Sequence, residues 1–474
     1  MPASRSSSIA PSDMQRLWGT LVVLNSARAQ RRAPFLDRRV VEARRDARIR
    51  AMVAYAGQHV PYYRDLFARE RIDPREVRGA GELDALPRLS RDEVRREPSR
   101  FLSTARRAHE RLGLLTGGTT GTPLEVQHDS VSLLCNIGYG ERERAAVIAL
   151  CGGTFRPREL HIGYETSNLR KILAFYAAST RLPVKPRRQS VSMTASFEEI
   201  VETINRERPD VLTAYGGFLD ALFRTVEARG LRVHAPKVVM YVGETLPRER
   251  RTWIEQVLGS RVMSRYCSAE AFKIGYFCER GTGFHLHDDL CHVRVVRPDG
   301  TRCADGEAGE IVISNLVNRA TVLLNYPTGD VASMQGAPCA CGRSHRLMSE
   351  VDGRLEDMLP LENGTQLHPR AVWAALKDEP EILQYQLVQH QVSRFELKLV
   401  TLSADTFEAL GQRARASLLR VLGAGARIDV VREPELGRLE RAATGKFRAV
   451  ESRVPRQARV PPAAGTAPQT AAGR

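Results

Sequence analysis

The stretch Thr116-Gly117-Gly118-Thr119-Thr120-Gly121-Thr122, followed by Pro123, is the most distinctive segment of this 474-residue chain. Three glycines and four threonines in seven residues do not suit a packed helix or strand. A loop of this composition exposes backbone N–H groups and hydroxyl donors that can bind phosphate oxygens. It lacks the Gly-Lys-Ser/Thr ending of a Walker loop. The loop alone leaves two interpretations open, a phosphate site and a plain flexible connection.

Two later motifs carry carboxylates. Tyr266-Cys267-Ser268-Ala269-Glu270 sets an aromatic ring, a hydroxyl and a carboxylate at alternating positions, which share one face of an extended chain. Such groups can stack on a base, bond a phosphate and hold Mg²⁺. Tyr326-Pro327-Thr328-Gly329-Asp330 is a Pro/Gly turn that presents Asp330, and a carboxylate is suited to bind both hydroxyls of a ribose. A half-buried strand and ordinary turn chemistry are the alternatives.

Two more motifs lie nearer the C-terminus. Asp352–Asp357 is a charged stretch with a glycine, placed where the composition of the chain changes. Its alternative interpretation is a polar linker whose charges are solvated. Thr444–Arg448 places Lys446 on a glycine turn, from which a lysine can reach into a cleft as a mobile point charge. A solvated surface lysine is the alternative there.

The chain between these motifs alternates predicted helices and strands. Phe197–Arg206 and Phe218–Ala228 are predicted helices, and Val238–Val242 is a short apolar run typical of a buried strand. The β-branched runs Glu310–Ser314 and Ala320–Leu324, separated by an Asn-rich turn, predict two further strands. Alternation of this kind predicts a mixed α/β domain.

The last third of the chain predicts a separate β-β-α-β unit. We therefore expect an α/β fold, with a large N-terminal domain of mixed sheets and helices over residues 14–354 and a small, mobile α+β lid domain over residues 355–453. Residues 1–13 are Ser/Pro-rich and residues 454–474 are Pro/Ala/Gly-rich, which predicts two disordered tails. The elements predicted in the unit are strands at Gln384–Val388, Arg394–Leu402 and Arg427–Val431 and a helix at Asp405–Leu422.

Composition narrows the possible partners. With 42% hydrophobic residues the chain can bury a sizeable core, and it contains no apolar run long enough to span a bilayer and no secretory signal. We therefore expect a cytoplasmic protein with no membrane partner. The formal net charge of +16 comes mostly from arginines scattered among Glu and Asp, without an aromatic-interleaved basic platform. This predicts a solvated surface and no nucleic-acid partner.

The eight cysteines predict no disulfide scaffold in a long chain without a secretory signal. Cys339 and Cys341 form a close thiol pair, and Cys278 and His285 lie upstream. Three thiolates and one imidazole make a closed tetrahedral set for structural zinc. His287 is an alternative to His285, and unpaired buried thiols are the alternative to a metal site. The cysteines interpreted as core or surface thiols are Cys135, Cys151, Cys291 and Cys303.

The order and spacing of the five motifs resemble the adenylate-forming superfamily of acyl-CoA synthetases, adenylation domains and luciferases. The resemblance is to its phenylacetate-CoA ligase-like branch, which includes capsule-biosynthesis-associated relatives. It spans about Val40 to Val450, including His59–Phe67. It implies a monomeric or homodimeric enzyme that uses ATP to activate a carboxylic acid as an acyl-adenylate and releases pyrophosphate.

The resemblance also implies acyl transfer in a second step. We expect an aryl or short acyl acid and CoA as the acceptor. Two alternatives stay open. One is an amine, hydroxyl or carrier-protein acceptor, as capsule or natural-product biosynthesis would use. The other is an inactive binding protein on the same fold, against which Glu270, Asp330 and Lys446 argue.

The resemblance implies a role in nucleotide binding for five matched residues. Tyr266 would stack on the adenine ring, which Gly243 and Glu244 would border. Asp330 would bind the ribose hydroxyls, with Arg354 nearby. ATP and Mg²⁺ are therefore the expected cofactors, beside the structural Zn²⁺ that the cysteines predict.

Five further matches concern the phosphates and the lid. Thr116–Gly121 would hold the β- and γ-phosphates, Ser268 would contact the α-phosphate and Glu270 would ligate Mg²⁺. Lys446 would bridge the carboxylate of the acid and the α-phosphate during adenylation. Glu356 matches the hinge about which the small domain rotates.

Three positions depart from the pattern of the family: Gly117 stands where Ser is usual, Thr122 where Lys is usual, and Cys267 where Gly is usual. The missing lysine removes one phosphate contact, so we expect backbone amides, hydroxyls and Mg²⁺ to hold the pyrophosphate. The acid pocket is not carried over by the resemblance, and ordinary packing of aromatic rings is an equal alternative for its candidates. The candidates are Tyr215 and Gly216, chosen by their place after a predicted strand, with Tyr164 and His161 as further ones.

Overall fold

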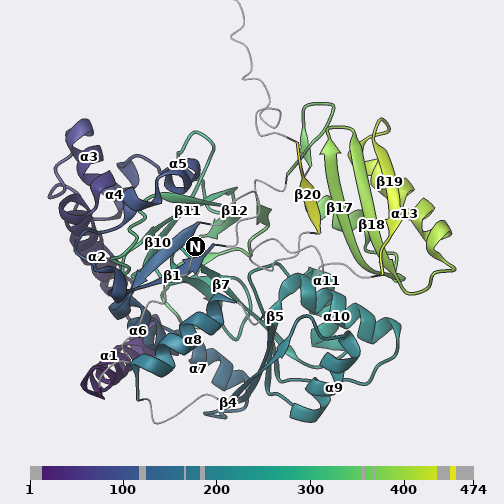
Figure 1. The fold of residues 1–474 in the computed structure, drawn as a ribbon, viewed down its shortest axis with the longest axis horizontal. Helices are drawn as coiled ribbons and strands as arrows, with labels where there is room; N and C mark the ends of the chain where they lie inside the picture. The colour runs from purple at the N-terminus through teal and green to yellow at the C-terminus, as the bar shows by residue number, and fades with distance from the viewer. Residues whose placement is uncertain are drawn as a thin grey trace, which may run out of the picture. The chain divides into compact units, whose positions relative to one another are not determined.

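The structure, a computed structural model, falls into two compact units, the first ending at Asp352 and the second beginning at Gly353 (Figure 1). Both predicted tails lie outside the described residues, except for Asp13, which is the first residue of a helix, and Val454. No helix in the described part of the chain is long and apolar enough to cross a membrane. The described residues are 13–116, 124–164, 167–181, 187–354, 358–367, 369–434 and 449–454.

Helices form the N-terminal part of the first unit, and local sequence signals set their ends. Pro61 begins a helix directly after the previous one ends at His59, because proline tolerates the first helical position but not an interior one. Ser90 caps the helix that follows it, since its Oγ accepts a hydrogen bond from the backbone N–H of Glu93. These helices are α1 (Asp13–Arg32), α2 (Arg38–His59), α3 (Pro61–Glu70), α4 (Ala80–Ala85) and α5 (Arg91–Arg96), with 3-10 turns at Ala33–Phe35, Pro98–Phe101 and Ala108–Glu110.

The main sheet has the order β10-β11-β12-β13-β9-β8-β7-β6-β5-β3-β4. Strands β7, β6, β5, β3 and β4 pair in parallel, and the remaining neighbours pair antiparallel. The strands are β3 (Arg158–Gly163), β4 (Arg187–Ser192), β5 (Val211–Tyr215), β6 (Val238–Val242), β7 (Arg261–Ser268), β8 (Phe272–Phe277), β9 (Phe284–Leu286), β10 (Cys291–Val296), β11 (Ala308–Asn315), β12 (Tyr326–Gln335) and β13 (Leu347–Met348).

A separate antiparallel pair and six helices complete the first unit. The predicted helices at 197–206 and 218–228 are confirmed within one or two residues, as is the predicted strand at 238–242. The pair is β1 (Arg111–Leu115) with β2 (Glu125–Asp129). The helices are α6 (Ser130–Tyr139), α7 (Glu141–Leu150), α8 (Asn168–Ser179), α9 (Phe197–Glu207), α10 (Gly216–Ala228) and α11 (Arg248–Gln256).

The predicted strand at Ala320–Leu324 is wrong. The segment is buried, as its apolar composition requires, but it does not follow one neighbouring strand. Its backbone donors reach three different partners: Val322 N–H bonds the carbonyl of Phe101 at 3.1 Å, and Leu324 N–H bonds the hydroxyl of Tyr63 at 2.7 Å. Thr321 N–H bonds a third carbonyl, that of residue 127. The strand begins only at Tyr326.

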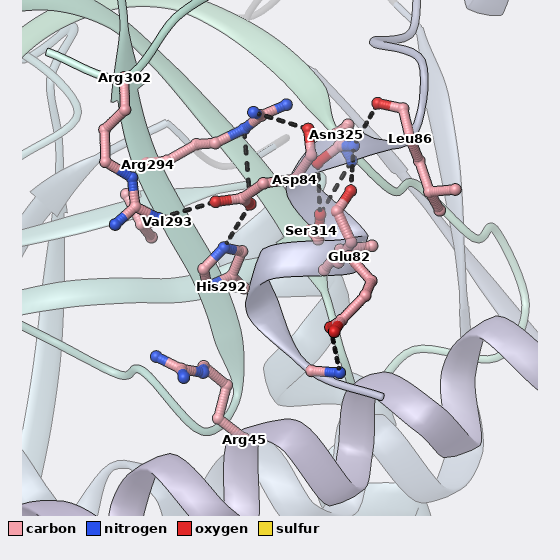
Figure 2. A network of polar contacts seen from close by, with 12 residues as sticks. Arg45, Glu82, Asp84, Leu86, His292, Val293, Arg294, Arg302, Ser314 and Asn325 are labelled. Atoms are coloured by element: carbon pink, nitrogen blue, oxygen red, sulfur yellow. Dashed lines mark hydrogen bonds and ion pairs between the residues drawn. The ribbon is translucent and has the colours of Figure 1, made fainter. Parts of the chain in front are cut away.

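Helix α4 is bound to the sheet by a buried polar network (Figure 2). The Asp84 carboxylate accepts from His292 Nε2 at 2.8 Å and from Arg302 at 2.7 Å, with Arg294 3.7 Å away. Burial opposes ionisation of Asp84, but these donors hold its pKa below the usual value. Asn325 Nδ2 donates to the carbonyls of residues 83 and 86. The N-terminal helices and strands β10 to β12 are thereby joined.

The second unit contains the predicted β-β-α-β elements, each within three residues of its predicted ends. Its sheet has the order β19-β18-β17-β20, and apolar side chains of β17 and β18 pack with those of α13. The elements are β14 (Gly353–Arg354), β15 (Leu359–Pro360), β16 (Gln366–Leu367), α12 (Pro369–Leu376), β17 (Ile382–Gln391), β18 (Arg394–Thr401), α13 (Phe407–Leu422), β19 (Arg427–Arg432) and β20 (Val450–Ser452).

Candidate active site

The carboxyl ends of four parallel strands meet at one edge of the main sheet. Tyr215, the last residue of β5, lies opposite Val242, the last residue of β6, and β6 pairs in register with β7. Tyr164 directly follows β3, Gly243 follows β6 and Tyr266 lies near the end of β7. In open α/β sheets, ligands bind in the crevice outside the carboxyl ends of such strands. The predicted nucleotide and acid residues therefore share one edge.

Tyr266 and Asp330 are in direct contact, although 64 positions separate them in the chain. The Tyr266 hydroxyl donates to Asp330 Oδ2 at 2.7 Å, and both side chains are buried. The predicted turn is wrong, because Tyr326–Asp330 lies within strand β12. A register shift against β11 falls here, where Gly329 has φ 79° and the Asp330 N–H donates to the hydroxyl of Thr328 at 3.1 Å. This irregularity presents the Asp330 carboxylate to the predicted aromatic ring.

Ser268 is the last residue of β7, and Glu270 lies in the turn that joins β7 to β8. Ser268 Oγ accepts from the N–H of Ala271 at 3.2 Å, and Phe272 has a left-handed backbone at φ 57°, which is uncommon for a bulky residue. A register shift also falls between Tyr266 and the next residue. The extended face that the alternating sequence predicts therefore ends at Ser268, and Glu270 lies in a turn.

His128 and Asn315 hold this turn from two sides. His128 Nε2 lies 2.6 Å from the carbonyl of Ala269, and its ring packs on Phe272 with centroids 3.9 Å apart. Burial lowers the pKa of His128 to about 4, so the ring is neutral and its Nε2–H is the donor. Asn315 Nδ2 donates to the carbonyl of Glu270 at 2.9 Å. Both residues were missed from the sequence, where only the place of His128 shortly after the glycine loop marks it.

Thr116 closes the base of the glycine/threonine loop. Its backbone N–H donates to the carbonyl of Leu124 at 2.8 Å, and its hydroxyl accepts from Leu124 N–H at 3.0 Å. Strands β1 and β2 continue this pairing, with Leu115 opposite Glu125. The two ends of the loop are thus held together, while Gly117, Gly118, Thr119, Thr120 and Gly121 lie outside the described residues.

Glu244 caps the N-terminus of helix α10. Gly243 has φ 70°, and Glu244 Oε2 accepts from the N–H of Gly217 at 3.1 Å. Gly216 is packed so closely that a Cβ there would lie 2.5 Å from the carbonyl oxygen of Glu244. The loop predicted to border the adenine and the glycine predicted in the acid pocket are therefore neighbours. A side chain at Gly216 would displace the loop.

Two tyrosines predicted for the acid pocket lie close to this loop. Burial raises the pKa of Tyr215 to about 12, with smaller contributions from the charges of Glu244 and Tyr164. Tyr164 is itself buried. His161, the further candidate, lies on β3, and burial lowers its pKa to about 4, which keeps the ring neutral. These rings offer apolar faces and uncharged polar atoms.

Three predicted residues cannot be located as side chains. Glu356, the predicted hinge, and Lys446, the predicted catalytic lysine, lie outside the described residues. Arg354 is part of β14, but its side chain is also outside the described set. Their roles stay predictions.

The four predicted metal ligands come together. Cys278, His285, Cys339 and Cys341 each offer a ligand atom, and all four atoms lie within 4.8 Å of one another. Cys278 Sγ and Cys339 Sγ are 3.7 Å apart, and Cys341 Sγ is 3.3 Å from His285 Nε2. His287, the alternative ligand, instead lies beside Arg142, with Nδ1 3.5 Å from its Nη1.

The cluster fits a tetrahedral metal ion. Two thiolates bound to one zinc lie about 3.8 Å apart, whereas a disulfide needs sulfurs about 2 Å apart. The sulfurs of Cys278 and Cys339 match the first distance. The N–H of Arg280 donates to Cys278 Sγ at 3.4 Å, and Thr282 Oγ1 lies 3.5 Å from Cys339 Sγ. Burial lowers the pKa of His285 to about 4, which leaves the neutral imidazole that binds metals.

Comparisons with known proteins identify the relatives of this fold. No protein-family model matches the chain. A phenylacetate-coenzyme A ligase of Thermus thermophilus is 28% identical over 409 residues, which cover 84% of this chain and 89% of that protein. A second phenylacetate-coenzyme A ligase, from Aromatoleum evansii, is 23% identical over 428 residues, covering 86% and 94%. The chain is therefore similar, over most of its length, to phenylacetate-coenzyme A ligases.

A solved structure shares the fold of this chain. It is 2-hydroxyisobutyryl-CoA ligase in the postadenylation state in complex with R3-HIB-AMP, with a TM-score of 0.67 and 17% sequence identity. The superposition covers 96% of this chain and 96% of that chain. The predicted mixed α/β fold class is confirmed.

Proposed function

We propose that this chain is an AMP-forming acid–thiol ligase. It activates a carboxylic acid with ATP as an acyl-adenylate, releases pyrophosphate and transfers the acyl group to CoA. The observation that carries the proposal is the contact of Tyr266 with Asp330, 2.7 Å between hydroxyl and carboxylate, at the strand edge beside the Ser268–Glu270 turn. An aromatic ring, a carboxylate and a polar turn at one edge are what a nucleotide needs for its base, ribose and phosphates.

The nucleoside half of ATP is held by groups at the strand ends. The Tyr266 ring stacks on the adenine, and Gly243 and Glu244 border it. Asp330 accepts hydrogen bonds from the ribose hydroxyls, with Arg354 assisting. The Tyr266 hydroxyl fixes the orientation of the Asp330 carboxylate, so one oxygen is already bonded and the ribose is offered a preset geometry.

The phosphates are held by the glycine/threonine loop and the β7–β8 turn. Backbone amides and hydroxyls of Thr116 to Gly121 bind the β- and γ-phosphates, and Thr116 fixes the base of the loop. Ser268 contacts the α-phosphate. Glu270 would hold Mg²⁺ through its carboxylate oxygens, which are hard ligands, and the hydrogen bond from Asn315 to its backbone carbonyl holds the turn. When bound there, Mg²⁺ would neutralise charge that develops on the phosphoryl oxygens.

Two transfers follow one another. A carboxylate oxygen of the acid attacks the α-phosphorus, and the bond to the pyrophosphate oxygen breaks. Lys446 bridges the carboxylate and the α-phosphate and stabilises the negative charge of the transition state. The sulfur of CoA then attacks the acyl carbonyl carbon, and AMP leaves with the bonding electron pair. The second unit acts as the lid, which turns about Glu356 between the steps.

The acid is aryl or short acyl. Tyr164, Tyr215 and Gly216 lie at the strand edge next to the proposed adenine border. Neutral aromatic rings suit an apolar acid whose charge lies only at its carboxylate. The loop that carries Glu244 packs directly against Gly216, and no side chain fits there. The glycine therefore allows this loop to lie close to the proposed acid pocket.

The cysteine cluster holds a structural Zn²⁺. Cys278, His285, Cys339 and Cys341 supply all four positions, which leaves none for a substrate, and such closed sites contribute folding free energy and no catalysis. The cluster joins the end of β8, strand β9 and the segment before β13. It therefore stabilises the antiparallel half of the sheet.

A panel of carboxylic acids in an ATP–pyrophosphate exchange assay tests the proposal. Exchange that depends on an aryl or short acyl acid supports adenylation, and AMP formation that requires CoA supports the thiol acceptor. No exchange with any acid would contradict adenylation. If acyl-AMP forms but reacts only with an amine, a hydroxyl or a carrier-protein thiol, the CoA acceptor is wrong and the adenylation step stands.

A further inference from the structure

Helix α1 buries its smaller and more polar face. Gly19 packs against the backbone of α8 so closely that a Cβ would lie 2.2 Å from the carbonyl oxygen of Ser179. Ser26 Oγ donates to the carbonyl of Cys135 at 3.2 Å, and Gln30 Oε1 accepts from the buried Arg142 at 2.7 Å. These contacts are spaced along one side of the helix and fix its rotation. The opposite side is thereby turned outward.

The outward side of α1 is strongly apolar. Its five large side chains recur at helical spacing and lie on one face. In the described part of the chain, thirteen large hydrophobic side chains are exposed, and these five are among them, so exposure is concentrated on this helix. A contiguous apolar face that the fold leaves in water marks a site of interaction. The exposed fractions are Met14 78%, Leu17 53%, Trp18 50%, Leu21 65% and Leu24 47%. We call this set the α1 face.

Basic residues outnumber acidic residues on α1 and on its neighbour α8. Helix α1 lies at the edge of the first unit beside α6 and α8 (Figure 1). The only acidic residue of α1 and α8 is Asp13, and it is paired with Arg181. The basic residues of these two helices are Arg16, Arg28, Arg31, Arg32, Arg170 and Lys171, of which Arg31 is paired with a glutamate of α7.

We propose that the α1 face binds the surface of a bilayer rich in anionic lipid, with α1 lying in the plane of the headgroups. An interfacial helix combines Leu and Trp on one side with basic residues beside them, which is the pattern here. Charge complementarity selects this occupant, because a second copy of the chain would bring the same basic residues and a formal net charge of +16. The expectation of no membrane partner considered only segments that could span the bilayer.

Vesicle binding tests the proposal on the full chain. In a background of Trp253→Phe and Trp373→Phe, Trp18 is the only indole, since the chain has three tryptophans. Vesicles of mixed phosphatidylcholine and phosphatidylglycerol should shift its emission to the blue and sediment the protein, and pure phosphatidylcholine vesicles should do neither. Added salt should weaken the binding. Arg28→Ala and Lys171→Ala should each reduce the partition coefficient by about fivefold.

A matched pair of charge substitutions supplies the control. Leu21→Glu should reduce the partition coefficient by about tenfold or more. Val257→Glu, at a residue 63% exposed against 65% for Leu21, should leave it unchanged. Equal binding of the two variants would overturn the proposal. Equal binding of the wild-type protein to neutral and to anionic vesicles would overturn it as well. A second copy of the chain would be the occupant if the wild-type protein does not bind vesicles and forms a dimer in sedimentation equilibrium that Leu21→Glu dissociates. That result would also overturn the proposal. Unaltered circular dichroism shows that both variants fold.

Discussion

The two ends of strand β8 hold polar groups in opposite ways. Its first residue, Phe272, ends the turn that carries Glu270, where His128 and Asn315 bond the backbone carbonyls of Ala269 and Glu270. Just beyond its last residue, Cys278 belongs to a cluster whose four ligand atoms face one another. In the proposed substrate site, neighbouring side chains fix the backbone of the turn. In a structural metal site, the side chains themselves are occupied as ligands.

The largest effect is expected at the closed end of the strand. Cys339→Ser should abolish binding of the one zinc ion expected per chain and lower the midpoint of thermal unfolding, because structural zinc contributes about 10 kcal/mol or more in small domains. Elemental analysis and calorimetry measure both. The matched variant Cys303→Ser, at a buried thiol outside the cluster, should retain zinc. Zinc content unaffected by Cys339→Ser would contradict the assignment.

The next largest effect is expected at the reacting atoms. Lys446→Ala should lower the rate of acid-dependent pyrophosphate exchange by about 10²–10³-fold, the usual cost of losing one preorganised stabilising group. The unfolding midpoint should not move, since the proposed role is in the transition state alone. Lys377→Ala, in the second unit and away from the five motifs, serves as the control. Full exchange activity in Lys446→Ala would place the catalytic charge elsewhere.

A moderate effect is expected at Asp84, which belongs neither to the proposed active site nor to the cysteine cluster. The pKa of Asp84 is below its usual value in the folded chain, so its ionised form stabilises the fold at neutral pH, and this contribution is lost as pH falls through the folded pKa. Asp84→Asn should lower the free energy of unfolding by about 1–3 kcal/mol at pH 7. It should also flatten the acid limb of the stability curve.

Urea titrations at a series of pH values measure this effect. Asp305→Asn, at an exposed carboxylate, should leave both the midpoint and the pH dependence as in the unaltered chain. An acid limb as steep in Asp84→Asn as in the unaltered chain would show that other carboxylates carry it.

The smallest effect sharpens the comparison at the open end of β8. His128→Phe keeps a ring against Phe272 but loses the donor to the carbonyl of Ala269. A hydrogen bond of this kind contributes about 1 kcal/mol, so the rate of adenylation should fall about fivefold and its Mg²⁺ requirement should rise. His128→Gln, which keeps a donor, should recover part of the loss. Identical behaviour of the two variants would mean that His128 only fills space.

The sequence predicts the parts of this fold that rest on local patterns. Val238–Val242 is apolar, short and bounded by a glycine, and it is β6. Ala320–Leu324 is equally apolar, but its backbone bonds three separate segments, and no local pattern encodes such partners. A prediction from residue spacing alone therefore overestimates the number of strands.

The candidate site shows the same difference between features that the sequence predicts and features that depend on distant partners. The four cysteine and histidine ligands are chemically specific and visible in the sequence, and they converge. His128 and Asn315 bond backbone carbonyls, which any residue could supply, so nothing in the sequence names their partners. The outward apolar face of α1 was also not predicted, because its direction depends on the close approach of Gly19 to α8.

The central claim is that the acid attacks the α-phosphorus of ATP. A single turnover with an acid labelled with ¹⁸O in its carboxylate, followed by mass spectrometry of the products, tests this directly. Adenylation and thiol transfer leave one labelled oxygen in AMP, because the carboxylate oxygen becomes the bridging oxygen of the acyl-adenylate. Label found in inorganic phosphate, or AMP formed without label, would contradict the account.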